Sequence, residues 1–459
     1  MLYFGLVLIG VASLGFLVAI HVTFWRAYYK PDESAVDQVL YARTQDGWRL
    51  AMHRYRGNAE RASQPVILCH GIGANRYTFD LGPQVSLARF LQRHGWDVWV
   101  VELRGVGRSK RMASHSRAHW DWDFSDYLDK DVPTLIDAVC AATGAPAVHW
   151  VGHSLGGILM YAHLQGEGAL KVRSATAIGS PGFFEPTPIL KSTTAALRFA
   201  GWLPVFKLTW LTWLFAPFYV GLRVPLILIN GANIDGIIVR RAMSHLVTDV
   251  CVSVARTIAH WVREQKLTQP DRDYQRGLAS IRTPMMLIFG DADAVAPSEE
   301  GVRIFDRLGS ETRLFHALGQ RHGFTEDYGH GDLLFGRHVR TECFPLIENW
   351  LATRAKDALP PPMPDTVLDE PVADVVPATL DGDADGADGT LPPVPTLPGP
   401  FGLLNRYSPF RRARWKEVRE QFRGREAAER EARAKGIDPT ASRFALRGRP
   451  PRRYPESKR

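Results

Sequence analysis

The first residue of chemical interest is a serine between two glycines. Residues 149–157 read HWVGHSLGG, so Ser154 stands between Gly152 and Gly156. A serine hydroxyl is a weak nucleophile until a nearby base takes its proton, and that base needs an orienting acid. The apolar run before the motif favours a strand that turns sharply into a helix and exposes the serine. Ser154 is therefore the candidate nucleophile, although a glycine-rich turn could contain a serine by chance.

Candidate acids follow another apolar run, TPMMLIFGDAD, at residues 283–293. Asp291 and Asp293 both stand at its end. We favour Asp293, because it lies three residues after Gly290 and can reach from the loop toward a histidine. Asp291 remains the alternative, and an isolated pair of this kind would be read as ordinary turn carboxylates.

The stretch 312–336 offers three histidines as the base, namely His316, His322 and His330. His316 belongs to an expected strand and is assigned a structural role. The other two lie in glycine-containing loop sequence. We favour His330 over His322, because His330 precedes GDLLFG, the expected start of a helix with Asp332 near its positive end.

An acyl-transfer site also needs two backbone N–H groups where negative charge develops. The expected donors of this oxyanion hole are Leu155, which follows the nucleophile, and Ile72, in the loop after the run PVILCHG. His70 and His153 flank the same tight turns, and we assign them to packing.

These candidates need a scaffold that brings distant loops together. From about residue 38, short apolar runs alternate with helical stretches, which predicts an α/β fold with a mostly parallel central sheet and flanking helices. The stretch 39–57 alternates around Asp46-Gly47 and predicts a β-hairpin. The main strand candidates are residues 65–71, 96–105, 147–154, 174–182 and 283–293. Such continuous apolar runs are typical of strands covered on both faces.

The alternation breaks at an apolar, mostly helical stretch of residues 183–282. We expect it to form a cap over the site, inserted into a hydrolase domain that spans residues 38–354. A second membrane span within residues 207–230 is the alternative, but Pro217, Arg223 and Pro225 would interrupt it.

Residues 1–25 contain no Lys, Arg, Asp or Glu and are long enough to cross a bilayer as a helix. The run lacks the basic start and short apolar core of a secretory signal. Aromatic and basic residues follow it, including Trp25, Arg26 and Lys30, as expected at a membrane interface. We therefore expect a single-pass anchor with a cytoplasmic-facing catalytic domain; a buried core helix is the alternative.

Charge is uneven along the 459 residues. Residues 401–459 hold 18 Lys and Arg against seven Asp and Glu, while the whole chain carries a formal charge of +8. We expect this basic tail to be partly helical and either in contact with anionic lipid or merely solvated; nucleic acid is not an expected partner. Residues 355–400 are acidic and rich in Pro and Gly, which predicts a disordered linker. Within it, DGDADG at 381–386 resembles a calcium loop, but position twelve is Pro392, so calcium binding is not expected.

The chain resembles α/β-hydrolases, and within them the acid lipase branch of gastric and lysosomal lipases. The similarity covers residues 40–352 and rests on DGWRL, HGIGAN, GWDVWVVELRGVGRS, WDFSDYLDKDVPTLIDAV, HWVGHSLGG, FGDADAVAP and GHGDLLFG. It implies a catalytic triad of Ser154, Asp293 and His330, with Leu155 and Ile72 as oxyanion donors. The chain departs from those lipases at Leu155, where they usually have Gln, and in its cap.

Together these observations predict a membrane-anchored serine hydrolase, resembling esterases and lipases, that cleaves a carboxylic ester of an apolar acyl group. No cofactor is expected, and the four scattered cysteines form no metal-binding pattern. An acyltransferase that uses the same triad and a non-catalytic membrane scaffold with this fold are the alternatives.

Overall fold

We describe the protein from a computed structural model, which covers residues 2–355 except 59–63, 112–119, 186, 189, 193, 196–202 and 219–227. The predicted basic tail at 401–459, the acidic linker beyond Ala355 and the calcium-like loop within it lie outside the described residues.

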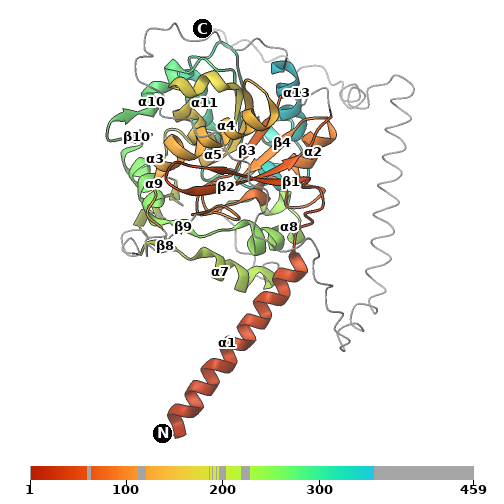
Figure 1. The fold of residues 1–459 in the computed structure, drawn as a ribbon, viewed down its shortest axis with the longest axis vertical. Coiled ribbons are helices and arrows are strands. Elements are labelled where there is room, and N and C mark those ends of the chain that lie inside the picture. Colours follow the sequence, from red (N-terminus) through yellow and green to blue (C-terminus); the bar gives the residue numbers. More distant parts are fainter. Residues whose placement is uncertain are drawn as a thin grey trace, which may run out of the picture. The chain divides into compact units, whose positions relative to one another are not determined.

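A nine-stranded sheet forms the centre of the molecule (Figure 1). The strand order is β1-β2-β4-β3-β6-β7-β12-β13, and β5 pairs with β2. The predicted hairpin is present as antiparallel β1 and β2, and β4 is antiparallel to β2. In the order β4-β3-β6-β7-β12-β13, each strand is parallel to the next. The strands are β1 Gln38–Arg43, β2 Trp48–Tyr55, β3 Val66–Cys69, β4 Val98–Val101, β5 Lys110–Arg111, β6 Val148–His153, β7 Val172–Ile178, β12 Met285–Gly290 and β13 Arg313–Leu318.

Two apolar cores cover the two faces of this sheet. In β3, Ile67 belongs to one core and Leu68 to the other, as the alternation of side chains along a strand requires. The first core is completed by α4 (Val132–Thr143), α5 (Leu155–His163) and α11 (Ser298–Arg307), and the second by α2 (Leu87–Arg93), α12 (Asp332–Phe335) and α13 (Phe344–Arg354). Burial on both faces explains why these strands read as continuous apolar runs.

The predicted cap contains short elements between β7 and β12. A two-stranded sheet pairs β8 (Val205–Phe206) with β9 (Val250–Cys251), and a second pairs β10 (Thr268–Gln269) with β11 (Arg272–Asp273). The described helices of this stretch are α7 (Leu208–Phe215), α8 (Gly236–Arg241), α9 (Val252–Glu264) and α10 (Tyr274–Gly277), with the short helices η5 (Ala216–Phe218), η6 (Gly231–Asn233), η7 (Ala242–Leu246) and η8 (Leu278–Ser280). The possible second span at 207–230 forms α7 and η5, and its part at 219–227 lies outside the described residues.

The N-terminal apolar run is a single helix, α1, that spans Leu2–Tyr29 and so extends past the predicted end at residue 25. Pro31 explains the end, because a proline disfavours helical geometry in the residue before it. Its stretch Ile9–Tyr29 is long and apolar enough to cross a membrane. Only 6% of an 18-residue part of this stretch is buried, which argues against a buried core helix. Among the described residues, no other helix meets the same length and composition.

Candidate active site

Ser154 lies where β6 ends and α5 begins, in a backbone conformation that side chains rarely adopt. Its φ is 53° and its ψ is −116°. The flanking glycines allow this turn, because a Cβ on Gly152 would lie 2.2 Å from the carbonyl carbon of Gly156. A Cβ on Gly156 would lie 2.3 Å from the backbone oxygen of Cys69 in β3. The motif therefore forms the sharp strand–turn–helix that its sequence predicted.

His330 and Asp293 meet across two loops. The His330 Nδ1–H donates to Asp293 Oδ2 at 2.8 Å, which leaves Nε2 free to act as a base. The other carboxylate oxygen of Asp293 accepts the N–H groups of Val295 and Ala296, at 2.8 and 2.9 Å. Hydrogen bonds thus hold both oxygen atoms of the Asp293 carboxylate in place before any substrate binds.

The pair lies next to the serine turn. His153, directly before Ser154, donates from Nε2 to the His330 backbone oxygen at 3.0 Å. Gly179, at the end of β7, has a φ of +52°, and a Cβ there would lie 3.2 Å from both Asp293 Oδ2 and His330 Nδ1. Ser154, Asp293 and His330 are all less than a tenth exposed. The structure therefore places the His330–Asp293 pair beside the turn that carries Ser154, and all three residues are buried.

The competing candidates lie elsewhere. Asp291 pairs with Arg321, with N–O distances of 2.7 Å, and accepts a hydrogen bond from the Ser298 hydroxyl. The side chain of His322 is 43% exposed and lies 3.5 Å from Asp291. His316 is half-buried in β13. Neither histidine is paired with Asp293.

The chain matches one protein family over residues 51–328, under the description serine aminopeptidase, S33. It belongs to this family of α/β-hydrolases. Its relatives place this S33-family member among the lipases and esterases, as a lipase/esterase-like serine hydrolase.

Two of those relatives are lipases from animals. Lipase lipl-3 of Caenorhabditis elegans is 25% identical over 354 residues, which cover 66% of this chain and 86% of that protein. The gastric triacylglycerol lipase of Rattus norvegicus is 28% identical over 175 residues, which cover 36% of this chain and 42% of that protein. A solved structure of the Paleococcus ferrophilus monoacylglycerol lipase aligns with 66% of this chain and 99% of its own, at 16% identity and a TM-score of 0.46.

In this S33-family hydrolase, the two predicted oxyanion donors line one cavity. Ile72 and Leu155 contribute to its wall, together with the loop after β4 and the residues around β9 of the cap. The lining residues are His70, Gly71, Ile72, Gly73, Leu103, Gly105, Val106, Trp122, Tyr127, Leu155, Asp249, Val250, Cys251 and Val254. Most of these side chains are apolar. The sequence did not predict that residues between 249 and 254 line this cavity, because no motif marks the cap residues that fold back over the site.

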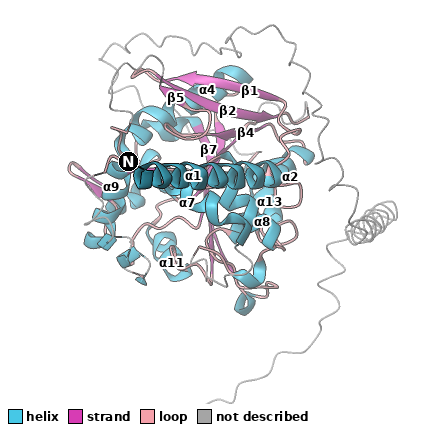
Figure 2. Ribbon diagram, turned by 90° about the horizontal axis from the view of Figure 1, so that it is seen from below, coloured by secondary structure: helices cyan, strands magenta, loops and turns pink. Residues whose placement is uncertain are grey.

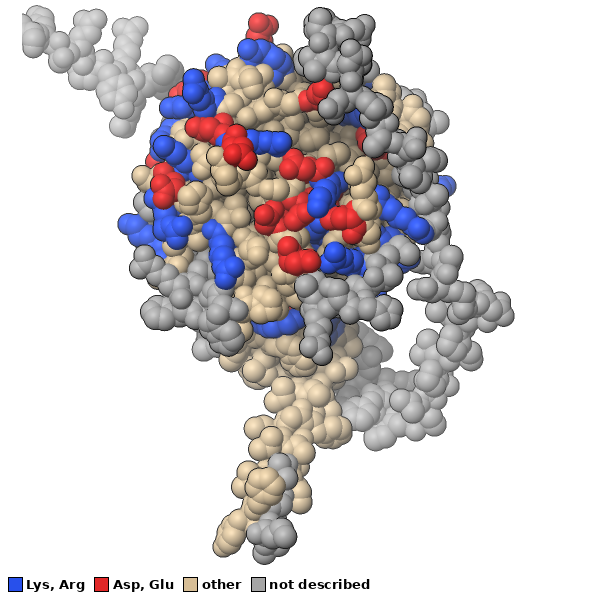
Figure 3. Space-filling model, turned by 60° about the vertical axis from the view of Figure 1, so that its left-hand side comes forward, with Lys and Arg blue, Asp and Glu red and all other residues tan. Residues whose placement is uncertain are grey.

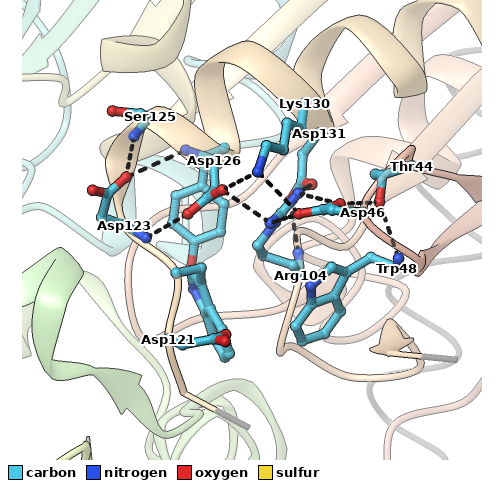
Figure 4. Close-up of polar contacts among 12 residues, drawn as sticks. Thr44, Asp46, Trp48, Arg104, Asp121, Asp123, Ser125, Asp126, Lys130 and Asp131 are labelled. Carbon is cyan, nitrogen blue, oxygen red and sulfur yellow. Dashed lines mark hydrogen bonds and ion pairs between the residues drawn. The ribbon is translucent and has the colours of Figure 1, made fainter. Parts of the chain in front are cut away.

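A buried ion network supports the wall that follows β4 (Figure 4). Arg104, between the cavity residues Leu103 and Gly105, donates from Nε and Nη2 to Asp131 Oδ1 at 2.9 and 2.7 Å. It also reaches Asp46 at 2.7 Å, on the turn of the first hairpin. Burial raises the pKa of Asp131 to about 6 and Arg104 opposes that rise, so the carboxylate is ionised at neutral pH.

The remaining histidines of the site region are buried and engaged in packing. His70 Nδ1 donates to the Gly71 oxygen at 2.8 Å, and its Nε2 accepts the Leu103 N–H at 3.3 Å. Burial and, to a smaller extent, the nearby His330 lower the pKa of His153 to about 3, so this ring is neutral at neutral pH. In the part of the chain that the structure describes, no group of three His, Cys, Asp or Glu residues could hold a metal ion.

Proposed function

We propose that this protein is a membrane-anchored serine hydrolase that cleaves a carboxylic ester of an apolar acyl group. The observation that carries the proposal is the buried hydrogen bond from His330 to Asp293, next to the strained turn at Ser154. The lipase names of its relatives support the ester as the bond that is cleaved. The apolar lining of the cavity supports an apolar acyl group.

In the proposed mechanism, the Ser154 hydroxyl attacks the ester carbonyl while His330 Nε2 takes its proton. The N–H groups of Leu155 and Ile72 bind the oxyanion that develops. His330 then returns the proton to the leaving alcohol, and Asp293 holds the ring and stabilises the imidazolium. Water, activated by His330, attacks the acyl-enzyme and releases the carboxylic acid.

The contacts of α1 favour an anchor that is retained over a signal sequence that is removed. His21 Nε2 donates to the Leu214 backbone oxygen at 3.3 Å, and His245 donates to that of Arg26 at 2.9 Å. Val22 and Tyr29 are at most 5% exposed. Removal of the helix would expose to solvent the residues against which these two side chains pack. The basic residues that follow the apolar run support a catalytic domain on the cytoplasmic side.

Labelling with a fluorophosphonate probe tests the catalytic role of Ser154. Wild-type protein is expected to react, and Ser154→Ala is expected to lose both labelling and esterase activity. His330→Ala is expected to lose activity, while the matched His322→Ala retains most of it. Labelling of Ser154→Ala, or greater loss in His322→Ala, would contradict these roles.

The anchor is tested separately from the chemistry. Protein extracted from membranes is expected to keep the residues of α1 by mass spectrometry and to resist extraction with alkaline carbonate. A mature chain that begins beyond Tyr29 would identify α1 as a cleaved signal instead.

A further inference from the structure

Exposed apolar side chains gather on two neighbouring parts of the protein. Among the described residues, all but four of the exposed large hydrophobic side chains lie on α1, α7 or η5. Trp210 and Leu211 of α7 are 58% and 59% exposed, and Phe218 of η5 is 54% exposed. Exposed apolar clusters of this kind on a folded protein mark an interaction surface.

The α7 helix packs against the C-terminal part of α1, as Figures 1 and 2 both show. The guanidinium of Arg26 lies 3.6 Å from the ring centre of Trp213. His21 stacks on Phe218 with ring centres 5.4 Å apart. This end of α1 carries Trp25, Tyr28 and Tyr29, which is the composition of a helix end at a membrane–water interface. If α1 spans a bilayer with this end at the interface, its contacts bring α7 to the same depth.

The sequence of α7 fits such a position. It reads LTWLTWLF and contains no charged residue, yet its eight residues are too short to cross a bilayer. A short apolar helix with tryptophan is suited to the boundary between headgroups and acyl chains. The α1 helix also contains no Lys, Asp or Glu, and its one Arg, Arg26, lies in the last turn. Charged side chains gather instead on the rest of the protein (Figure 3).

The same helix is tied to the wall of the cavity. Asp249 accepts hydrogen bonds from the Thr209 N–H and hydroxyl at 3.2 and 2.8 Å, and it pairs with Lys207 at 2.9 Å. Asp249 lines the cavity, together with Val250 and Cys251 of β9. The N-terminal end of α7 is thus fixed to the cap residues that cover the candidate oxyanion hole.

We propose that α7 and η5 form a second, peripheral membrane contact beside α1, and that the ester enters the site from the bilayer. The docking surface consists of Leu208, Trp210, Leu211, Phe215 and Phe218, and its partner is the lipid surface. With this surface in the bilayer, the cavity wall at Asp249 adjoins the membrane. The proposal that the ester enters from the bilayer rests on the proposed ester hydrolysis. It narrows the substrate class to esters dissolved in lipid.

The position of α7 is measured without any catalysis. An environment-sensitive fluorophore is attached to Leu211→Cys in the full chain, which is placed in phosphatidylcholine nanodiscs. Val302→Cys, an exposed apolar site on α11, is the matched control. Brominated phosphatidylcholine is expected to quench the label at 211 and to leave the label at 302 unchanged. Equal quenching at the two sites, or none at either, would overturn the proposal.

The route of the substrate is tested by two esters. Leu211→Asp is expected to lower hydrolysis of a long-chain diacylglycerol in phosphatidylcholine vesicles about tenfold, the effect of losing the burial of one large apolar side chain. Hydrolysis of water-soluble p-nitrophenyl butyrate is expected to be unchanged, as are both rates in Val302→Asp. An equal loss on both esters, or no loss on either, overturns entry from the bilayer. Activity of Ser154→Ala on the soluble ester would instead overturn the proposed function and leave the quenching result standing.

Discussion

Replacement of Asp293 by Asn tests the proposed site most closely, because the structure determines how the new amide must lie. Asp293 Oδ1 accepts two backbone N–H groups, and Oδ2 accepts the proton of His330 Nδ1. An Asn has one acceptor oxygen and one donor NH₂. If its oxygen stays with the N–H groups of Val295 and Ala296, its NH₂ faces His330. The ring must then carry its proton on Nε2, where it cannot accept the proton of a serine.

The opposite orientation restores the correct tautomer at a cost that can be estimated. It points the NH₂ at the two backbone N–H groups and leaves both unsatisfied in a buried place. Each unsatisfied group costs about 1–3 kcal/mol, so the active arrangement is disfavoured by roughly 2–6 kcal/mol, or a factor of about 30 to 10⁴. We expect kcat/KM of Asp293→Asn to fall within this range while the fold is kept.

The assay is kcat/KM on p-nitrophenyl butyrate, with the melting temperature as a check on the fold. The matched control is Asp291→Asn, at a carboxylate that pairs with exposed Arg321. This control is expected to stay within a few-fold of wild type. Wild-type activity in Asp293→Asn, or an equal loss in Asp291→Asn, would refute the proposed role of Asp293.

Three further predictions concern stability. Gly156→Ala forces a Cβ to 2.3 Å from the backbone oxygen of Cys69. It is expected to lower the free energy of unfolding by about 1–3 kcal/mol and to reduce fluorophosphonate labelling. The control Gly166→Ala, whose Cβ would have no atom within 4 Å, is expected to be neutral. Arg104→Met leaves the buried carboxylate of Asp131 without its cationic partner and is expected to cost about 3–5 kcal/mol in chemical denaturation. Arg272→Met, at a pair exposed to solvent, is expected to cost under about 1 kcal/mol. Burial lowers the pKa of His149 to about 3, so as the pH falls this histidine takes up a proton in the unfolded chain before it does so in the folded one. The contribution of His149 to the free energy of unfolding therefore falls by about 1.4 kcal/mol per pH unit between about pH 6.5 and pH 3. The melting temperature of His149→Gln should fall less steeply over this range, and an unchanged slope would contradict the assignment.

Much of the scaffold could be predicted because its signals are local. The Asp46-Gly47 turn predicted the β1–β2 hairpin, and the apolar runs before Ser154 and Asp293 predicted β6 and β12, which the structure confirms. The placing of His330 in a loop before a helix is also confirmed, since α12 begins at Asp332. The catalytic roles of the three residues stay predictions.

The rest depends on contacts between residues far apart in the sequence. Nothing near Asp249 indicates that it caps α7 and lines the cavity, because both contacts arise from how the cap folds. Arg104 is also ambiguous in sequence, since a lone arginine after a strand is more often exposed. Its burial requires Asp46 and Asp131, which lie 58 and 27 positions away.

The strained turn at Ser154 has a consequence for how this chain can change over time. A non-glycine residue in such a conformation costs about 1–3 kcal/mol, which glycine would avoid. Selection for a durable fold alone would therefore favour glycine at this position, whereas selection for the proposed reaction would keep a hydroxyl there. A lineage that no longer needs the chemistry is expected to drift to glycine at 154 early, and its fold would then outlast that of its active ancestor.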